Sequence, residues 1–557
     1  MKRRELAHKM FPDISDTLSD LEQTYPKRYL ERGAYVTRFA PSPTGFLHTG
    51  SLFTALISKS VAMRKNGVFF VRLEDTDTKR EVEGAADSLL SDLALFGLNP
   101  DEGFLGTEEK GLYGPYRQSD RAAIYRTVIK QMIVDNKAYP CFCSNSDLDN
   151  LRKRQEKEKV VPGYYGRYAK CSTLTVDQAL KKVNAGEDYV VRFRSKGNHQ
   201  NKIVVSDLLR GDIEIAENDH HIVILKGDGL PTYHFAHLCD DHFMRTTLVT
   251  RGEEWLSSLP LHVELFKSMN FDLPKYAHLP LINKLDDGKK RKLSKRYDEE
   301  AAVSYFINLG YPLEAILTYL MSIANYNFED WWRVNKRTDI LKFPFQFENM
   351  SLDGALFDVE KLNFFAREFI AVLTAEEVLE RLRDFSEAQN DEKLTKLITD
   401  NEAYFIKILN IERGGLKPRK DFTYFADIYE QIKFFFDEEY YPLFDNVGIN
   451  LFNPKFSKEL IINLLTSLKT NLVYRRGNEV WFDSLKKVAS AFNFALTGRE
   501  YRANPALYLG MTGDVAEMLR IAIVSSKQSP NMYEVLTILG KKRVNERIDY
   551  AIEKLSK

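Results

Sequence analysis

Cysteine is scarce in this sequence: the 557 residues contain four, three of them between positions 141 and 171. So few cysteines in so long a chain exclude a disulfide framework and indicate a reducing compartment, for which the cytoplasm is the default. The sequence also lacks any run of about 18 apolar residues, so we expect no segment that spans a membrane. The charged start, Met1 to Leu6, leads into no apolar core of signal-peptide length.

A charge excess of either sign is missing as well. Lysine and arginine together number 79, and so do aspartate and glutamate, which gives a formal net charge of zero. This balance argues against a protein that holds nucleic acid through a global basic field, so any nucleic-acid surface must be local. The length is too great for one hydrophobic core, and we therefore expect several domains.

The order of the expected elements divides the chain into an α/β part and a helical part. Residues 34–140 alternate strands and helices, and Val68–Leu73 is the mostly apolar run expected of a buried parallel strand. A charged helix and short strands then indicate an insertion over 141–220, and the α/β alternation resumes over 221–300. Beyond about residue 300, amphipathic helices replace the strands.

The most informative stretch is a turn rich in proline and glycine, Pro41–Gly45, which leads into His48-x-Gly50. A β-rich run precedes it and a helix follows, which is where an α/β sheet binds phosphates. Gly50 would let a nucleotide approach the backbone closely, and His48 can donate to phosphate oxygens that gain charge in a transition state. Without the preceding turn, His48 would be interpreted as a surface side chain beside a helix cap.

A second candidate for phosphate binding is the basic run Lys289–Arg296. Lys292 and Lys295 are three residues apart, so a single loop turn can aim both ammonium groups at one triphosphate and neutralise charge as a leaving group departs. The alternatives are a solvated basic run or a nucleic-acid patch. Its position after the second α/β half favours the phosphate role.

These two motifs carry a resemblance to a known family. The turn and its His-x-Gly are similar to the PSPTG…HxG signature of class I glutamyl-tRNA synthetases of bacterial type. Lys289–Arg296 resembles their KMSKS loop, with Leu293 in place of Met and Arg296 in place of the last Ser. The resemblance extends from about residue 10 to the C-terminus and is strongest over 35–100, 226–300 and 351–425.

The resemblance implies a fold class: an α/β, Rossmann-type catalytic domain with an α+β acceptor-binding insertion, followed by an all-α C-terminal anticodon-binding region. The expected domains are an N-terminal extension (1–33), the first half of the catalytic domain (34–140), the acceptor-end-binding insertion (141–220), the second catalytic half (221–300), a stem-contact helical linker (301–350) and the helical anticodon-binding domain (351–557).

The activity that the resemblance implies is ligation of L-glutamate to the 3′ end of tRNA(Glu) through a glutamyl-adenylate. ATP with Mg²⁺ would be consumed, and AMP and pyrophosphate released. We expect a monomeric protein and leave open whether tRNA(Gln) is also charged. The candidate phosphate contacts in the tail are Lys417, Arg419, Arg475, Arg476, Lys541, Lys542 and Arg543.

Three alternative functions share parts of this sequence pattern. A glutamyl-queuosine tRNA modifier shares the catalytic half but lacks the helical tail. A glutaminyl enzyme would carry C-terminal β-barrels, whereas this tail has a helical pattern. A non-catalytic tRNA-binding paralogue would lose His48, Lys292, Lys295 or Arg251, and all four are present.

An acidic substrate with two carboxylates needs two fixed cations, and the planar fork of arginine matches a carboxylate better than lysine does. Arg38 and Arg251 are the candidates. By the resemblance, Ser42 and Glu74 hold the α-amino and α-carboxyl end, and Tyr233 lines the side-chain pocket. An isolated Glu74 would instead be interpreted as a helix-cap or salt-bridge residue. The ATP-binding residues implied in the same way are His48, Gly50, Glu254, Trp255, Lys292 and Lys295.

The cysteines allow two interpretations. Some family members bind structural zinc in this segment through a CxC pair and two later ligands. Here Tyr168 stands where a family cysteine would fall and Cys171 is displaced, and three thiolates with a tyrosine are a poor zinc set. The sequence therefore favours buried, inert cysteines, with Cys141, Cys143 and Cys171 as zinc ligands in the alternative. We expect the fourth, Cys239, to lie in the core.

Overall fold

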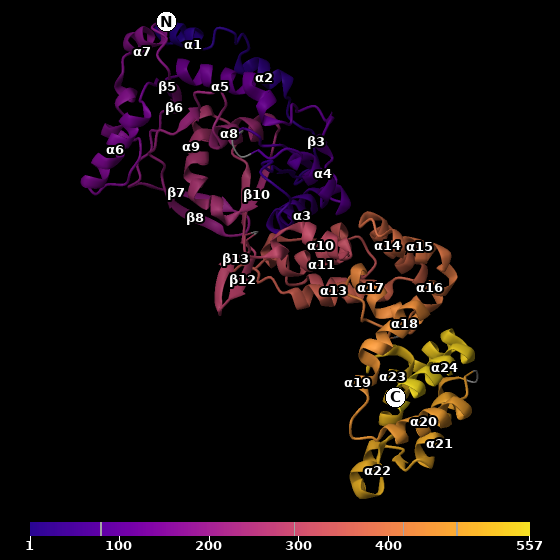
Figure 1. The fold of residues 1–557 in the computed structure, drawn as a ribbon. Coiled ribbons are helices and arrows are strands. Elements are labelled where there is room, and N and C mark those ends of the chain that lie inside the picture. The colour runs from indigo at the N-terminus through magenta and orange to yellow at the C-terminus, as the bar shows by residue number, and fades with distance from the viewer. Residues whose placement is uncertain (78–80, 295, 416, 475–476) are drawn as a thin grey trace. The chain divides into compact units, whose positions relative to one another are not determined.

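A parallel sheet organises the first part of the molecule in the computed structural model, which describes residues 1–557 except 78–80, 295, 416 and 475–476 (Figure 1). The chain divides into two compact units. The first comprises Met1–Ile307 and Ile316–Val359, and the second Asn308–Ala315 and Glu360–Lys557. Among the described residues, no helix combines the length and apolar character that a membrane crossing needs.

The first sheet begins with two parallel strands joined by a helix. In β1 (Val36–Phe39) and β2 (Val68–Val71), Arg38 lies opposite Phe70, and α3 (Thr49–Met63) connects them. All four residues of β1 are buried, as expected of a parallel strand covered on both faces. The remaining strands are β3 (Glu102–Phe104), parallel to β2, and β4 (Glu109–Lys110), antiparallel to β3.

The second sheet continues beside β1. Its strands β10 (Leu248–Gly252) and β11 (Lys275–Leu279) run parallel. Thr247, just before β10, donates its backbone N–H to the carbonyl oxygen of Val36 over 3.0 Å, which places β10 next to β1. The strand order therefore runs from β1 to β4 on one side and from β10 to β8 (Gly211–Ala216) on the other. The boundary between β1 and β10, where the direction of the order reverses, is the topological switch point at which such sheets bind ligands.

The other helices and strands of the first unit are α1 (Lys2–Met10), α2 (Leu18–Thr24), α4 (Ala85–Leu95), α5 (Ala122–Val134), α8 (Tyr233–Phe243), η4 (Glu253–Ser258), α9 (Leu259–Met269), β12 (Asn283–Asp286), β13 (Lys289–Lys292), α10 (Val303–Leu309), α11 (Leu313–Ala324) and α12 (Phe328–Val334), with the end of α10 and the start of α11 assigned to the second unit. Leu6, Ala7 and Met10 of α1 belong to the same buried cluster as α5, so the N-terminal segment packs on the α/β domain.

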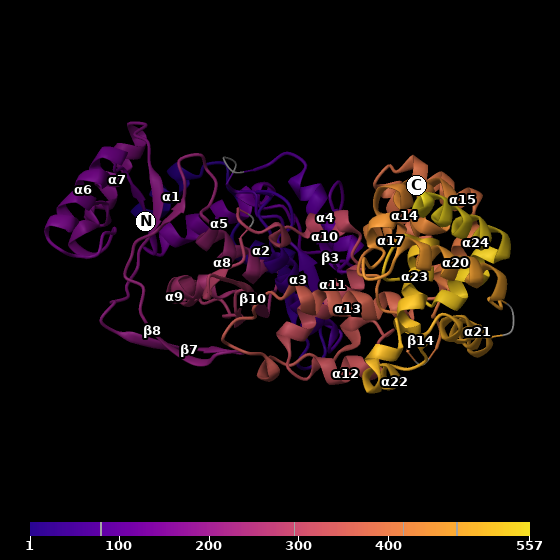
Figure 2. The ribbon, with the colours of Figure 1, turned by 60° about the horizontal axis from the view of Figure 1, so that its bottom comes forward.

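An antiparallel sheet lies at the segment predicted as an insertion, 141–220, and two of its strands extend beyond those bounds. The strands are β5 (Ala138–Cys141), β6 (Val190–Phe193) and β9 (Val223–Leu225), and the helices of the segment are α6 (Asn145–Lys157) and α7 (Val176–Asn184). The charged helix begins at a capping box in which Ser144 and Asp147 each bond the other's backbone N–H. Figure 2 shows α6 and α7 together at one end, with the hairpin of β7 (Lys202–Asp207) and β8 (Gly211–Ala216) running back toward the main sheet.

The second unit is helical around one large apolar core. A stacked pair, Phe434 and Phe435, lies in it with ring centroids 4.4 Å apart. Two strands of two residues each, β14 (Phe494–Ala495) and β15 (Gly510–Met511), interrupt the helices. The helices are α13 (Val359–Val372), α14 (Ala375–Ala388), α15 (Glu392–Asp400), α16 (Glu402–Leu409), α17 (Phe425–Ile432), α18 (Asp437–Leu443), α19 (Ile449–Leu451), α20 (Lys458–Asn471), α21 (Asn478–Ala491), α22 (Gly498–Ala503), α23 (Thr512–Val524) and α24 (Met532–Ser556). The predicted fold class, an α/β domain with an insertion followed by a helical C-terminal region, is confirmed.

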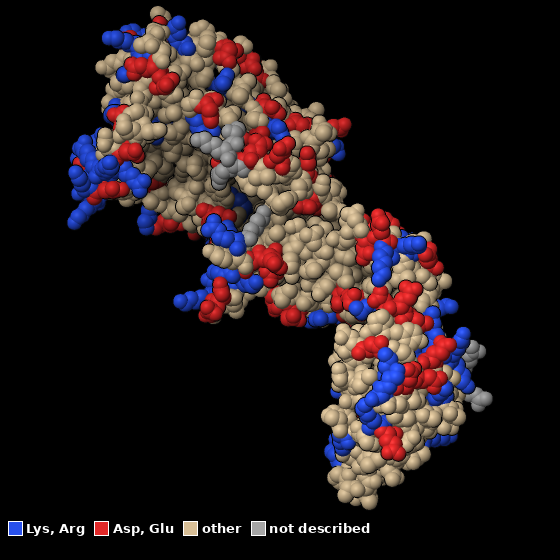
Figure 3. Space-filling view, in the orientation of Figure 1, with Lys and Arg blue, Asp and Glu red and all other residues tan. Residues whose placement is uncertain are grey.

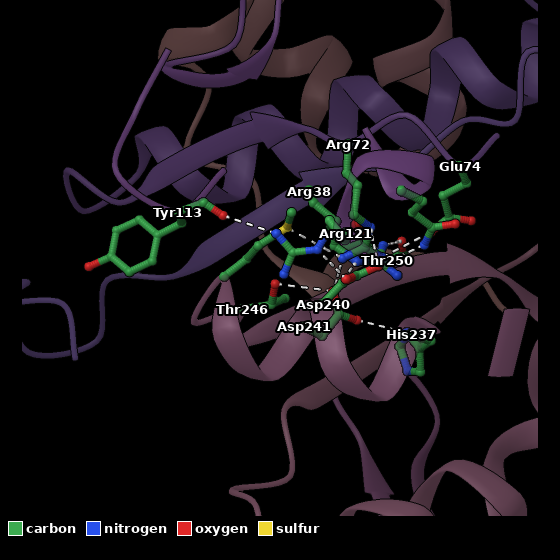
Figure 4. Close-up of polar contacts among 12 residues, drawn as sticks. Arg38, Arg72, Glu74, Tyr113, Arg121, His237, Asp240, Asp241, Thr246 and Thr250 are labelled. Atoms are coloured by element: carbon green, nitrogen blue, oxygen red, sulfur yellow. Dashed lines mark hydrogen bonds and ion pairs between the residues drawn. The ribbon is translucent and has the colours of Figure 1, made fainter. Parts of the chain in front are cut away.

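A network of buried charges ties the first unit together at the switch point (Figure 4). Asp241 of α8 accepts hydrogen bonds from Arg72 over 2.7 Å and from Arg38 over 3.3 Å. Its neighbour Asp240 accepts from Arg121 over 2.6 Å. Burial alone would raise the pKa of Asp241, but the two arginines and His237 outweigh it and hold that pKa well below its ordinary value.

Replacing Asp241 by Asn should destabilise the first unit strongly. Asn keeps the shape but leaves Arg72 and Arg38 without their shared anion, and breaking a buried ion pair costs about 3–5 kcal/mol. We expect a lower urea midpoint for the transition seen by tryptophan fluorescence in a Trp481→Phe background, where the remaining tryptophans all lie in the first unit. The control is Asp272→Asn, whose partner Lys27 lies 3.7 Å away with both side chains exposed. Equal midpoints for the two variants would contradict the prediction.

Candidate active site

A cavity of about 1000 Å³ opens at the carboxyl ends of β1 and β10. It collects residues from the turn after β1, from α8, from the segment after β10 and from β13. The predicted glutamate-pocket residues Arg38, Ser42, Glu74, Tyr233 and Arg251 all line it. So do the predicted ATP-site residues His48, Gly50, Glu254, Trp255 and Lys292, whereas Lys295 lies outside the described residues. The sequence motifs therefore converge on a single cavity.

The two candidate arginines differ in how their charges are balanced. Arg38 is 4% exposed and is paired with Asp241, and its Nη1 also donates to the carbonyl oxygen of Thr250 over 3.2 Å. Arg251 is 5% exposed, and no carboxylate within ion-pair distance of it is found among the described residues. Arg251 therefore brings an uncompensated positive charge to the cavity wall.

Neutral groups surround Arg251 instead. Its Nε donates to Nε2 of His278 over 3.0 Å, its Nη1 donates to Nδ1 of His262 over 3.1 Å, and the guanidinium lies over the ring of Tyr276. Burial, together with His237 and Arg251, lowers the pKa of His262 well below its ordinary value, so this imidazole is uncharged. The remaining nitrogen, Nη2, is buried and has no hydrogen-bond partner within the described part of the chain. Such a group is satisfied by an anionic ligand.

Glu74 supplies the acidic group of the pocket. Its Oε1 accepts from Nη2 of Arg72 over 2.9 Å, and the side chain is 7% exposed at the cavity. Burial raises the pKa of Glu74, and the nearby Arg72 and Arg38 oppose that shift. A carboxylate held in this way can accept from an ammonium group of a ligand.

His48 caps the N-terminus of α3 with its side chain. Its Nδ1 accepts the backbone N–H of Gly50 over 2.9 Å, so the proton of the neutral ring resides on Nε2, which becomes a donor. The N-terminus of α3 adds the partial positive charge of the helix dipole. A Cβ at Gly50 would lie 3.2 Å from Nδ1, so glycine lets the imidazole fold back onto the helix.

The cavity lining also includes two aromatic rings and a half-exposed cation. The rings of Tyr233 and Trp255 have centroids 4.3 Å apart at 31°. Lys292 lies 3.7 Å from Glu254, and both side chains are about half exposed, so this ion pair is weak and can be exchanged for a ligand.

Arg291, on strand β13 of the basic hairpin, is held by a buried carboxylate. Arg291 donates bidentately to Asp298 over 2.6 and 2.9 Å, and the backbone N–H of Ser294 also donates to Asp298. Asp298 has a buried side chain. Arg291 is therefore a structural anchor of the hairpin, while Lys292 extends to the cavity.

Sequence reasoning missed the residues that hold the site in place. Arg72 belongs to a run interpreted as an apolar strand, and it is fully buried. His262 and His278 lie within apolar stretches and carried no motif. The sequence does contain one signal: these polar residues occupy positions where the apolar period predicts a buried side chain. Because buried polar groups need hydrogen-bond partners, such residues are candidates for a buried polar network.

The three cysteines between β5 and α7 come together. Their sulfur atoms lie within 4.8 Å of one another, and Cys143 and Cys171 are 3.6 Å apart. The phenol beside them belongs to Tyr164, whose hydroxyl lies 3.3 Å from Cys143 Sγ and 3.5 Å from Cys141 Sγ. Tyr168, which the sequence placed at the missing ligand, bonds Glu158 instead. Cys239 is fully buried, as expected.

This cluster fits a tetrahedral zinc ion. Sulfur atoms that share zinc at a Zn–S distance of about 2.3 Å stand ~3.8 Å apart, close to the spacing found here. A phenolate oxygen would complete four ligands. The sequence predicted a weak set of three thiolates and a tyrosine, and the structure places Tyr164, not Tyr168, beside the thiols.

Charged side chains are mixed on most of the face in Figure 3, with lysine and arginine gathered over α6. That helix contributes Arg152, Lys153, Arg154 and Lys157. In the tail, Arg419 pairs with Asp421, and Arg543 pairs with Asp437 at 3.1 Å. Lys417 and Lys541 are exposed, Lys542 lies 3.9 Å from Glu546, and Arg475 and Arg476 lie outside the described residues.

Comparison with known proteins agrees with this geometry. Residues 34–364 match the family model described as tRNA synthetases class I (E and Q), catalytic domain, and residues 510–552 match an anticodon binding domain. The chain belongs to the class I tRNA synthetases of the E and Q, that is glutamate and glutamine, family.

Individual relatives narrow the comparison within this class. The chain is 43% identical over 555 residues to the glutamate–tRNA ligase of Clostridium beijerinckii, covering 99% of each sequence. It is 42% identical over 553 residues to that of Clostridium perfringens strain 13, covering 98% of this chain and 100% of the relative. A solved glutamate tRNA ligase from Elizabethkingia meningosepticum, in complex with its amino acid, matches with a TM-score of 0.73 and 28% identity, covering 94% of this chain and 99% of that one.

Proposed function

We propose that this protein ligates L-glutamate to the 3′ end of tRNA(Glu), consuming ATP and releasing AMP and pyrophosphate. The observation that carries this conclusion is Arg251, a buried cation without a carboxylate partner in the described part of the chain, at a cavity that also contains a phosphate-binding helix N-terminus. Glutamate–tRNA ligases similar over 98–99% of the chain support the same activity.

The reaction has two steps. First, an oxygen of the glutamate α-carboxylate attacks the α-phosphorus of ATP, forming the carboxyl–phosphate anhydride of glutamyl-adenylate as pyrophosphate leaves. A terminal ribose hydroxyl of the tRNA then attacks the carbonyl carbon, forming the ester as AMP leaves. Mg²⁺ enters as part of the ATP substrate, held by the phosphates. No protein nucleophile is needed, because positioning and charge stabilisation supply the rate.

We assign the residues of the cavity to these steps. Nε2–H of His48 and the N-terminus of α3 bind phosphate oxygens, and Lys292 leaves Glu254 to neutralise the departing pyrophosphate. Lys295 has the same role by prediction. Trp255 and Glu254 hold the base and ribose, Ser42 and Glu74 hold the amino-acid backbone end, and Tyr233 lines the side-chain pocket.

Selectivity for glutamate over glutamine follows from Arg251. An amide would leave the buried guanidinium without an anion, at a cost of ~2–5 kcal/mol, or roughly 30- to 4,000-fold in specificity. Aspartate is one methylene shorter, which apolar contacts distinguish by only ~1–3 kcal/mol. The remaining discrimination against aspartate must come from the separation between Arg251 and the part of the pocket formed by Arg38 and Glu74.

Labelled glutamate should become acid-precipitable on purified tRNA(Glu) in the presence of ATP. Pyrophosphate exchange without tRNA should be weak, as is usual in this family. A parallel reaction with tRNA(Gln) determines whether that tRNA is charged. Absence of charging on tRNA(Glu) would contradict the proposed function, and strong exchange without tRNA would contradict the tRNA dependence.

Arg251→Gln should raise the KM for glutamate about 30-fold or more, because the charge complementarity of a buried pair is lost. The KM for ATP should change little. Steady-state aminoacylation with each substrate varied measures both constants, and Arg333→Gln, an exposed arginine on α12, is the matched control. A near-normal glutamate KM in Arg251→Gln would mean that the pocket is wrongly assigned.

We further propose that Cys141, Cys143, Cys171 and Tyr164 hold a structural zinc ion, which would fix the loops of the insertion and take no part in the chemistry. The sequence favoured inert cysteines, and the convergence of three sulfur atoms and a phenol supports zinc. The protein purified under reducing conditions should contain about one zinc per chain by mass spectrometry of the metal. Cys171→Ala should lose the metal and Cys239→Ala should retain it. Metal-free protein, or retention in Cys171→Ala, would contradict the proposal.

Charging of tRNA(Gln), the monomeric state, the cytoplasmic location, the anticodon-reading residues and the domain boundaries stay predictions. The glutaminyl alternative within the same family is disfavoured by Arg251, because a neutral amide has no use for an unbalanced buried cation.

A further inference from the structure

The orientation of Arg251 is determined by a chain of hydrogen bonds that reaches well behind the cavity. Nε and Nη1 of its guanidinium each donate to one ring nitrogen, Nε2 of His278 over 3.0 Å and Nδ1 of His262 over 3.1 Å. Both histidines are fully buried. The chain continues beyond them, to Asp207 on one side and to His234 on the other.

The donor and acceptor roles in this chain follow from arginine. A guanidinium can only donate, so the facing nitrogens of His278 and His262 must both carry a lone pair, and both rings are neutral. The proton of His278 then resides on Nδ1, which donates to Oδ2 of Asp207 over 2.7 Å. The proton of His262 resides on Nε2, which donates to Nδ1 of His234 over 3.0 Å. One arrangement of protons therefore satisfies every link.

Asp207 is itself held rigidly at the end of β7. Its Oδ1 accepts the backbone N–H groups of Leu209 and Arg210 over 2.9 and 3.0 Å, and its Oδ2 accepts that of His278 over 3.0 Å. These three backbone bonds oppose rotation of the Asp207 side chain. The fixed carboxylate then favours the tautomer of His278 that has its proton on Nδ1. Arg210 reinforces the corner by donating to the carbonyl oxygen of His278 over 3.2 Å.

Neutral acceptors orient a guanidinium without cancelling its charge. A carboxylate in the place of either imidazole would neutralise Arg251, as Asp241 does for Arg38. Two imidazoles use two of the three guanidinium nitrogens, and Nη2 stays buried with no hydrogen-bond partner among the residues that the structure describes. The arrangement therefore keeps both the charge and a directed donor for the ligand.

We propose that His278, His262 and Asp207 are positioning residues that set the specificity of the enzyme for an acidic side chain over its amide. The inference rests on the proposed function, in which Arg251 binds the side-chain carboxylate of glutamate. Asp207 fixes the tautomer of His278, and the two histidines fix the plane of Arg251. None of the three lines the cavity, so none acts by touching the substrate.

A matched pair of variants tests the assignment. In His278→Gln the amide oxygen reaches the position of Nε2, so it retains an acceptor for Arg251. In His278→Asn the shorter amide reaches only the position of Nδ1 and retains the link to Asp207 alone. We expect His278→Asn to raise the glutamate KM roughly 10- to 100-fold, as for loss of a hydrogen bond to a charged group. His278→Gln should stay within about threefold of wild type.

Other readouts separate positioning from a structural role. The KM for ATP and the melting temperature should be similar in the two variants, and discrimination between glutamate and glutamine should fall only in His278→Asn. The exposed His8→Asn is the control. As a second variant, Asp207→Asn presents an amide donor to Nδ1 of His278 and moves the ring proton to Nε2, which removes the acceptor for Arg251. It should reproduce the rise in glutamate KM, and it decides the outcome if His278→Asn does not fold.

The possible failures are distinguishable. If wild-type protein does not charge tRNA(Glu) with glutamate, the proposed function and this inference both fail. If wild-type protein charges normally while His278→Asn and Asp207→Asn keep its glutamate KM and its discrimination against glutamine, only the inference fails. Equal losses in His278→Gln and His278→Asn would also overturn it, because the acceptor would then not be the property that matters.

Discussion

The structure of the first unit depends on buried arginines that are each paired with a buried aspartate. Arg72 and Arg121 are fully buried, and the cost of removing such ions from water is recovered only when each one meets its counterion in good geometry. Asp240 and Asp241 meet these requirements from adjacent positions on α8. The ion pairs join side chains of β1, of α8 and of the end of β2, so the network stabilises the relative placement of these three segments.

The same arrangement explains why two arginines at one cavity behave differently. Arg38 takes part in the network, and its charge is largely used by Asp241. Arg251 lies across the switch point, among aromatic rings and neutral imidazoles, and keeps its charge for a ligand. Among the described residues, Arg38 is therefore paired with a carboxylate of the protein and Arg251 is not, so only Arg251 needs an anion from outside the protein. Of the two arginines, Arg251 therefore contributes the larger share of uncompensated positive charge to the cavity, even without a ligand.

The parts that the sequence could predict are those encoded locally. A β-rich run, a turn of proline and glycine and a His-x-Gly at a helix start are contiguous, so the phosphate site after β1 is recognisable from its own residues. The fold class follows from the change in apolar period along the chain, and the residues of the cavity follow from motifs. None of these three predictions depends on knowing which distant segments pack against each other.

The parts that the sequence could not predict are pairings across the fold. Arg38 and Asp241 are 203 residues apart, and nothing in either segment names the other. Tyr164, four positions before Tyr168, is the phenol at the thiols because the backbone of the loop brings it there. A histidine in an apolar stretch shows neither which of its nitrogens accepts nor what it accepts from. Tertiary packing decides these questions, and only coordinates reveal them.

The anchoring of Arg291 by Asp298 has a consequence for the basic hairpin. Arg291 forms a bidentate ion pair with Asp298, which a lysine cannot form. The positive charge of the run that is available to a ligand is therefore smaller than its composition suggests, and an exchange of Arg291 for lysine would conserve the charge while losing the bidentate contact with Asp298.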